Sequence, residues 1–132
     1  MSLRKVAIVN DDTQFLTMME MILSDAGYDV LLLSEGDGAF QQLRSWVPDL
    51  IILDIRIEHP EAGWTILDLL RLNRSTEQTP VIVCSAAHDE LHSKAEHLNK
   101  YQCTPLLKPF NIDDLLNLVD EQVVPAQTLD DA

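Results

Sequence analysis

The sequence contains few cysteines, few basic residues and no long apolar run. Its two cysteines, Cys84 and Cys103, form no CxxC pair, so we expect free buried thiols in a reducing compartment rather than a disulfide framework. No apolar run approaches the ~18 residues that a membrane-spanning helix needs. The first five residues lack the apolar core of a signal peptide. These absences predict a cytoplasmic protein with no membrane partner.

The chain is strongly acidic. It has 22 aspartates and glutamates against 9 lysines and arginines, which gives a formal net charge of -13. Direct binding to a nucleic acid or to an anionic membrane surface requires a basic face, so neither partner is expected. Clustered acidic residues instead suit a site for a hard cation. A length of 132 residues, 46% of them hydrophobic, fits one globular domain. We expect this domain to span 1–122, followed by a C-terminal tail over 123–132.

The most informative stretch is Leu50–Asp54, four aliphatic residues that end on a carboxylate. Such a short run without alternation predicts a strand that is buried on both faces. Similar runs occupy 5–9, 28–33, 80–84 and 106–107, and segments with helical spacing lie at 13–26, 39–46, 64–72, 89–99 and 111–121. Strands that alternate with helices predict an α/β fold with a doubly wound, five-stranded parallel sheet. The expected architecture is flavodoxin-like, (βα)5, in three α/β/α layers.

Two helices carry further expectations. In the first, Asp12 or Thr13 can cap the start and Gly27 can end the helix in a left-handed conformation. Its core positions are predicted to be Phe15, Met18, Met19, Ile22 and Leu23. In the third, Trp64 is predicted to be a core residue at the start of the helix, although it could instead mark a partner surface.

Polar residues follow four of the predicted strands. Because the carboxyl ends of parallel strands meet at one edge of a sheet, these side chains should converge there. They are Asn10, Asp11 and Asp12 after the first strand, Asp54 after the third, Ser85 after the fourth and Lys108 after the fifth. Converging carboxylates repel unless an ammonium group or a divalent metal compensates them, and Mg²⁺ favours one or two carboxylates with waters and phosphate oxygens. This set suits phosphoryl transfer, with an aspartate as nucleophile. Taken alone, Asp54 would more often be a strand-end residue that caps the loop or the next helix, and the residues at the other strand ends change this balance.

From Lys5 to about Glu121 the chain resembles the receiver domain of two-component response regulators. The resemblance rests on the acidic cluster, Asp54, Ser85-Ala86 and Lys108-Pro109-Phe110, each at the end of a predicted strand. It implies that Asp54 is the phosphoacceptor and that Ser85 and Lys108 bind the phosphoryl group. The peptide bond that corresponds to Lys108-Pro109 is often cis in this family, so a cis bond is expected here. The resemblance also implies a site for Mg²⁺ (or Mn²⁺), whose expected ligands are Asp11, Asp54, the main-chain carbonyl of Arg56, Asn10 through a water and, as a further candidate, Asp12. No organic cofactor is implied.

The resemblance implies a signalling switch that catalyses only its own phosphorylation and dephosphorylation, rather than a metabolic enzyme. A histidine kinase or a phosphotransfer protein would be the donor, and the downstream partner or output domain is not specified. A homodimer is compatible with the resemblance.

Three departures from the family pattern stand out. Asp11, sixteen residues before Gly27, takes the place of the family's second acid, so Asn10 replaces the first. The loop after Asp54 has Pro60 and Gly63 later than usual, which makes it one residue longer. The aromatic residue that normally lies three positions before the lysine is replaced by Pro105.

These departures keep other functions open. A degenerate receiver would act as an interaction module independent of phosphorylation, which Asn10 and Pro105 favour and Asp54, Ser85 and Lys108 oppose. A flavin-binding flavodoxin-like protein would need a Ser/Thr/Gly-rich phosphate loop, and the acidic cluster is its electrostatic opposite. His88 and His92 have the i, i+4 spacing of zinc ligands, but no third ligand is evident, so a solvated helix face is favoured.

Overall fold

The computed structural model describes residues 3–55, 62–85, 99 and 103–131. Within these residues five parallel strands form one sheet in the order β2-β1-β3-β4-β5. The strands are β1 (Lys5–Val9), β2 (Asp29–Leu33), β3 (Leu50–Asp54), β4 (Val81–Ser85) and β5 (Cys103–Leu107). The helices are α1 (Thr13–Asp25), α2 (Ala39–Trp46), α3 (Ala62–Leu72) and α6 (Ile112–Asp131). The predicted doubly wound parallel sheet is therefore confirmed. The helix expected at 89–99 lies outside the described residues, apart from Asn99.

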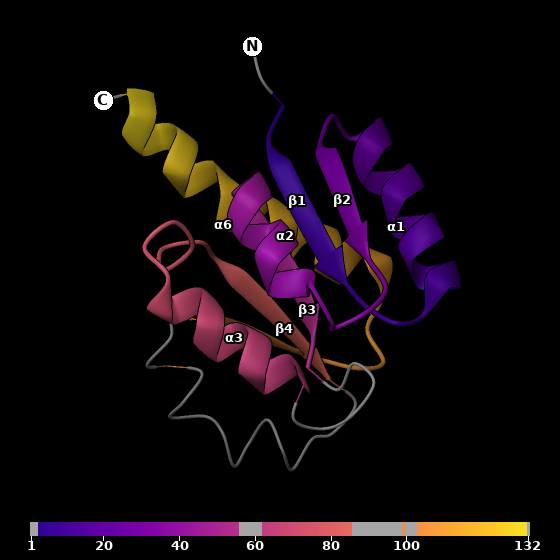
Figure 1. Ribbon diagram of the computed structural model, residues 1–132. Helices are drawn as coiled ribbons and strands as arrows, with labels where there is room; N and C mark the ends of the chain where they lie inside the picture. Colours follow the sequence, from indigo (N-terminus) through magenta and orange to yellow (C-terminus); the bar gives the residue numbers. More distant parts are fainter. Residues whose placement is uncertain (1–2, 56–61, 86–98, 100–102, 132) are drawn as a thin grey trace.

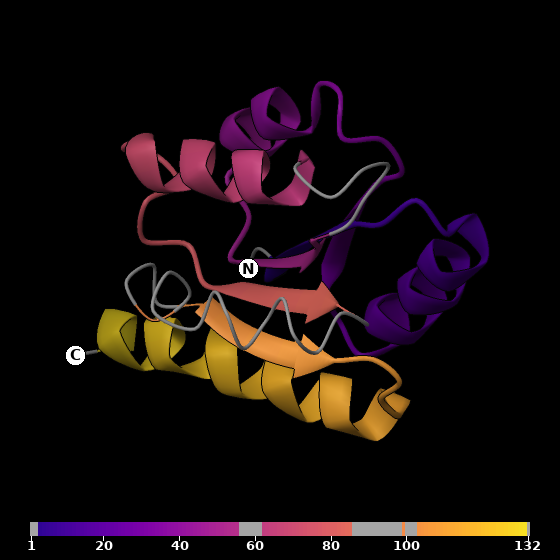
Figure 2. The same cartoon turned by 90° about the horizontal axis from the view of Figure 1, so that it is seen from below.

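The helices form two layers on the sheet. Helices α2 and α3 cover one face, and α1 and α6 cover the other (Figure 1; Figure 2). Each face has its own hydrophobic core, one built around Leu43, Ile51 and Leu67 and the other around Leu16, Ile52 and Leu115. Strand β3 supplies residues to both cores and is buried along its whole length, as its unbroken apolar run predicts. The strand that ends in Asp54 is thus held rigidly in the centre of the protein.

Local sequence signals explain how α1 begins and ends. The Asp12 side chain accepts hydrogen bonds from the main-chain N–H groups of Gln14 and Phe15, which confirms it as the cap. Gly27 follows the helix with a φ of 95°, a conformation that glycine adopts without strain. Together these signals place the N-terminus of α1 directly after the acidic residues.

The buried face of α1 differs from the prediction. Leu16, Met19 and Leu23 are buried, whereas Met18 is 38% exposed, so its placement in the core was wrong. Phe15 and Ile22 are only half buried. Residues 16, 19 and 23 form one stripe along a 3.6-residue helix, and Met18 lies about 100° away from residue 19 around the axis. The spacing of the apolar residues in the sequence was compatible with two neighbouring stripes along the helix. Contact with the sheet decided which of the two is buried.

Helix α3 begins against the chain that leaves β3. Gly63 is buried, and a Cβ atom at this position would collide with the main chain of Ile55. This close approach requires glycine and brings the start of α3 next to the end of the central strand. Trp64 is only 7% exposed and packs in the core with Leu67 and Leu70, which confirms its prediction as a core residue.

The predicted end of the last helix at Glu121 was wrong, because α6 continues to Asp131. Val123 is 3% exposed within the core, and Nε2 of Gln122 donates a hydrogen bond to Oγ1 of Thr104 at 3.2 Å. Packing therefore carries the helix past Glu121, although Pro125 lacks a main-chain donor for the helical hydrogen bond. The C-terminal turns of α6 extend beyond the other elements (Figure 1). The division into a domain over 1–122 and a tail over 123–132 stays a prediction.

Strand β5 is longer than the predicted 106–107 and includes Pro105. Among the strands that the structure describes, it pairs only with β4, and a proline without an N–H group is tolerated on such an edge strand. Among the helices that the structure describes, none combines the length and the apolar character needed to cross a bilayer.

Candidate functional site

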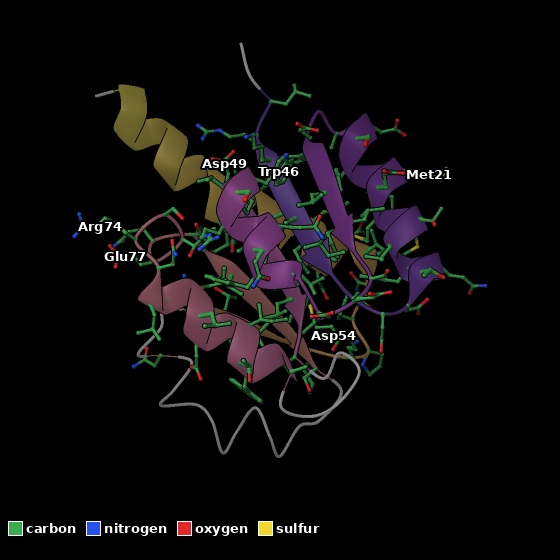
Figure 3. All side chains as sticks on the ribbon, viewed as in Figure 1. Met21, Trp46, Asp49, Asp54, Arg74 and Glu77 are labelled. Atoms are coloured by element: carbon green, nitrogen blue, oxygen red, sulfur yellow. The ribbon has the colours of Figure 1, made fainter. Side chains whose placement is uncertain are left out.

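Asp54 lies at the carboxyl end of the central strand β3 (Figure 3). Only 8% of the residue is exposed, and it is paired in register with Cys84 of β4. The chain after it continues the sheet for one residue, because the main-chain N–H of Ile55 donates to the carbonyl oxygen of Cys84 at 3.0 Å. The Asp54 carboxylate is therefore rigidly placed, nearly buried and at the edge of the sheet where ligands bind in open α/β folds.

Lys108 provides the positive charge that faces this carboxylate. Its Nζ atom lies 3.1 Å from Oδ2 of Asp54, within hydrogen-bond distance, and its side chain is 32% exposed. The main-chain N–H of Lys108 donates to the carbonyl oxygen of Ser85 at 2.8 Å, which fixes the start of the loop after β5. The bond between Lys108 and Pro109 is cis, as the sequence led us to expect.

The three polar residues after β1 differ in their surroundings. Asn10 is 5% exposed, and its Oδ1 accepts a hydrogen bond from the main-chain N–H of Asp12 at 2.8 Å. Asp12 is exposed and caps α1, while Asp11 between them is exposed to solvent. The sequence placed all three at the rim of the sheet, and the structure brings them to one cleft with Asp54 and Lys108.

This cleft has a volume of about 470 Å³. Its lining combines polar and charged side chains with apolar and aromatic ones and comprises Asn10, Asp11, Asp12, Phe15, Met18, Asp54, Lys108, Pro109, Phe110 and Ile112. The rings of Phe15 and Phe110 meet edge to face with centroids 6.4 Å apart, which joins α1 to the loop after β5. Sequence reasoning assigned Phe15 and Met18 to the core and so missed their place in the cleft. Their positions three and six residues after Asp12, on the first turns of α1, were the available signal.

Not every predicted site residue lines the cleft. Ser85 ends β4, is 1% exposed and is absent from the described cleft lining, although its carbonyl oxygen holds Lys108 in place. Arg56 and the rest of the loop after β3 that contains Pro60 lie outside the described residues. His88 and His92 also lie outside them, so the described part of the structure does not bear on a zinc site at these residues.

Cys84 lies beside Asp54 in the sheet and is an inert neighbour of the site. Burial raises the pKa of its thiol to about 12, while Lys108 lowers this pKa and Asp54 raises it, both more weakly. The thiol therefore stays protonated at neutral pH and is a poor nucleophile. Cys103 is not in a disulfide and is half buried, so the expectation of two buried thiols holds fully only for Cys84.

The donor set fits a magnesium ion better than a softer metal. In the described part of the chain, no group of three or more His, Cys, Asp or Glu side chains could hold a metal ion. What the cleft offers is carboxylates from two strand ends, Asp11 after β1 and Asp54 at the end of β3. Mg²⁺ commonly binds one or two carboxylates and fills its remaining positions with waters and phosphate oxygens.

Comparison with known proteins identifies the family. Residues 6–120 match the response regulator receiver domain. The chain is 34% identical over 120 residues to the transcriptional regulatory protein HprR of Escherichia coli, an alignment that covers 90% of this chain and 51% of HprR. The protein belongs to the response regulator receiver domain family, and it is a receiver domain of the two-component signalling type. It spans between about a quarter and about a half of the length of the curated relatives that it matches.

Solved structures agree with this fold. The signal receiver domain of a LuxO repressor protein from Vibrio parahaemolyticus superposes with a TM-score of 0.84 at 27% identity, covering 98% of this chain and 96% of that one. The receiver domain of the sensor histidine kinase PA1611 from Pseudomonas aeruginosa gives a TM-score of 0.76 at 22% identity, with coverages of 92% and 98%. The latter structure holds a magnesium ion in its active-site cleft.

Proposed function

We propose that Asp54 is the phosphoacceptor of this receiver domain and takes its phosphoryl group from a phosphohistidine in a Mg²⁺-dependent reaction. The observation that carries the proposal is the nearly buried Asp54 carboxylate at the end of β3 with the Lys108 ammonium group 3.1 Å away. The donor would be a histidine kinase or a phosphotransfer protein. The protein would act as a cytoplasmic switch whose phosphorylated and unphosphorylated forms differ in what they bind.

In the proposed step a carboxylate oxygen of Asp54 attacks the phosphorus atom of the phosphohistidine. A new O–P bond forms and the P–N bond breaks. The electron pair of the broken bond returns to the imidazole ring, which takes up one proton and leaves as neutral histidine. Lys108 offsets negative charge on the phosphoryl oxygens, an electrostatic effect that is strong in a site shielded from water.

The metal would be held at the acidic side of the cleft. Asp11 and Asp54 are the proposed direct ligands, with the main-chain carbonyl of Arg56 as a third and Asp12 as a further candidate. Bound there, Mg²⁺ would neutralise charge that develops on the transferred phosphoryl group. A water-mediated contact through Asn10 remains a prediction, and it would need the side-chain oxygen that already accepts the Asp12 N–H.

The outer face of α1 is the proposed contact surface for the donor. Met18 is 38% exposed, Met21 is 65% exposed, and together with Thr13, Gln14, Thr17 and Ile22 they line a shallow apolar groove. Met18 also lines the cleft, so the groove adjoins the proposed phosphorylation site. Helix α1 carries Glu20 and Asp25 but no lysine or arginine. A donor that docks here should therefore present an apolar patch with basic residues around it.

Phosphorylation by a small donor tests the proposal without knowledge of the kinase. The protein is incubated with phosphoramidate and Mg²⁺, and its intact mass is measured. We expect a gain of one phosphoryl group that Asp54→Asn abolishes. Glu77→Gln is the matched control, because Glu77 is an exposed acid at the opposite end of the sheet (Figure 3). A gain that persists in Asp54→Asn would place the acceptor elsewhere.

One observation favours a second candidate function. Asn10 replaces an acid of the family pattern, and its side-chain oxygen is engaged with the main chain. If no phosphoryl group is accepted, the chain would be a degenerate receiver that binds partners independently of phosphorylation. In either case the proposed output is binding to another protein, and a second copy of this chain in a homodimer is one candidate for that partner.

A further inference from the structure

The side chain of Asn10 is held in one orientation. Its main-chain N–H donates to the carbonyl oxygen of Leu33 at 3.0 Å, so the residue extends the pairing of β1 with β2. Its Oδ1 accepts the main-chain N–H of Asp12 at 2.8 Å in a tight turn. Turning the amide over would set an N–H₂ group against this N–H, with two donors facing each other. The oxygen therefore faces the turn, and the amide nitrogen is left to face the cleft that Asn10 lines.

Asn10 also lies beside the proposed phosphoacceptor. Val9 is paired in register with Leu53, and Asn10 follows Val9 directly after β1 while Asp54 follows Leu53 at the end of β3. Continuing the register by one residue puts Asn10 next to Asp54, and both line the cleft. Adjacent strands are about 4.8 Å apart, which is within the reach of an asparagine side chain plus one hydrogen bond. Lys108 approaches Asp54 from the opposite side, past the end of β4. Asp54 is thus flanked by a neutral donor group on one side and a charged donor on the other.

We propose that Nδ2 of Asn10 donates a hydrogen bond to the phosphoryl group carried by Asp54, an inference that rests on the proposed function. This role differs from that of a metal ligand. A water bound to Mg²⁺ turns its lone pairs to the metal and its hydrogens outward, so its neighbour must be an acceptor. The amide nitrogen, which faces the cleft, can only donate, and the amide oxygen, which could accept a second hydrogen bond, is turned to the Asp12 N–H. Asn10 would therefore make the site selective for the phosphoryl group rather than tighten metal binding.

Two substitutions separate these roles without removing the turn. Asn10→Ser keeps an oxygen that can accept the Asp12 N–H but has no amide nitrogen, and it adds no charge. Asn10→Asp keeps the shape and the acceptor but puts a carboxylate oxygen where the amide nitrogen was. The matched control is Asn73→Ser, because Oδ1 of Asn73 accepts the main-chain N–H of Ser75 at 3.0 Å in the same kind of turn, outside the cleft.

The measurements are calorimetric titrations of the full chain. Mg²⁺ is titrated alone, and beryllofluoride, a mimic of the phosphoryl group, is titrated at saturating Mg²⁺. We expect Asn10→Ser to weaken beryllofluoride binding by about tenfold, the effect of one hydrogen bond to a charged group, and to change Mg²⁺ affinity by less than about twofold. Asn10→Asp should tighten Mg²⁺ binding and still weaken beryllofluoride. Asn73→Ser should match the wild type in both titrations.

Two results would overturn the inference. Unchanged beryllofluoride affinity in Asn10→Ser would mean that the amide makes no bond to the phosphoryl group. A loss of Mg²⁺ affinity in Asn10→Ser as large as the loss for beryllofluoride would make Asn10 part of the metal site. Failure of the proposed function has a different signature, because beryllofluoride would then bind neither the wild type nor any variant, or would bind Asp54→Asn as well as the wild type.

Discussion

The Nζ atom of Lys108 lies 3.1 Å from Oδ2 of Asp54, although the two residues are 54 positions apart in the chain. They extend from β5 and β3, which are separated by β4, so the lysine side chain crosses the end of a whole strand. The hydrogen bond from its main-chain N–H to Ser85 fixes where this crossing starts. The contact provides the Asp54 carboxylate with a compensating charge in a place where only 10% of its side chain meets solvent.

Loss of the Lys108 charge should impair both chemistry and stability. Lys108→Gln is expected to slow phosphorylation by phosphoramidate at least tenfold, roughly the effect of one electrostatic group in a shielded site. It should also lower the free energy of unfolding by about 1 kcal/mol, because the nearly buried Asp54 carboxyl group loses the ammonium group beside it, an interaction that solvent partly screens. Mass spectrometry and urea unfolding measure the two effects. Lys108→Arg retains the charge, and a loss of stability equal to that of Lys108→Gln would contradict the argument.

The groove on α1 should matter only for a protein donor. Met21→Lys replaces a 65% exposed apolar side chain by a charge that a basic partner would repel. Transfer from a phosphorylated histidine phosphotransfer protein that serves the wild type should fall by about tenfold. Phosphorylation by phosphoramidate should not change. Leu72→Lys is the control, because Leu72 is 79% exposed on α3, on the other face of the sheet. Equal losses in both variants would argue against α1 as the docking surface.

Stability should decline in alkali partly through Cys84. Its folded pKa of about 12 lies above the value of 9.0 for an unfolded thiol, so the folded state holds the proton more tightly. The resulting contribution to stability is complete below about pH 9 and disappears as the pH rises towards about 12. Tyr28, whose pKa is also raised to about 12, chiefly by burial, contributes in the same direction.

Chemical unfolding of the parent and of Cys84→Ala at several pH values isolates the cysteine contribution. The variant should be less stable overall, because a buried side chain is shortened, but it should lose less stability between about pH 9 and pH 12. Tyr28→Phe serves as the comparison for the other group. Parallel curves for the parent and Cys84→Ala would show that the Cys84 pKa is not raised by folding.

Val47 is a site of backbone strain. Its φ is 52°, and it is the only non-glycine residue with a positive φ in the described part of the chain. This conformation is costly for a β-branched side chain, whereas asparagine adopts it readily. Because Val47 is 46% exposed, Val47→Asn loses little burial. We expect a gain of about 1 kcal/mol and a melting temperature a few degrees higher. Leu72→Asn, at another exposed apolar position with a negative φ, should bring no such gain.

Signal output should not depend on an aromatic side chain in β5. Pro105, which is exposed on this edge strand, stands where the family pattern has that side chain. Changes on activation are therefore expected at Ser85 and in the segment up to Asn99, most of which lies outside the described residues. Amide hydrogen exchange with and without beryllofluoride would locate them. A change confined to α6 would contradict this expectation.

Much of the fold was predictable because its signals are local. The unbroken apolar run of β3, the cap at Asp12 and the glycine at 27 each fix a structural element through short-range sterics and hydrogen bonds. The same runs predicted that Asp54 and Lys108 would end strands at one rim. Errors arose where packing overrides local preference, as at Met18, which faces solvent, and at the end of α6, which continues past Pro125.

The sequence by itself determined the order of strands and helices along the chain. It also determined that Asp54, Asp11 and Lys108 meet at one acidic rim, because parallel strands carry their carboxyl ends to a common edge. Only the tertiary structure decided the geometry within that site. It set the 3.1 Å contact between Lys108 and Asp54, and it brought the rings of Phe15 and Phe110 together in the lining of the cleft. It also turned the amide oxygen of Asn10 to the Asp12 N–H. Each of these depends on how far strands are offset and how helices pack on the sheet, which no local stretch of sequence encodes.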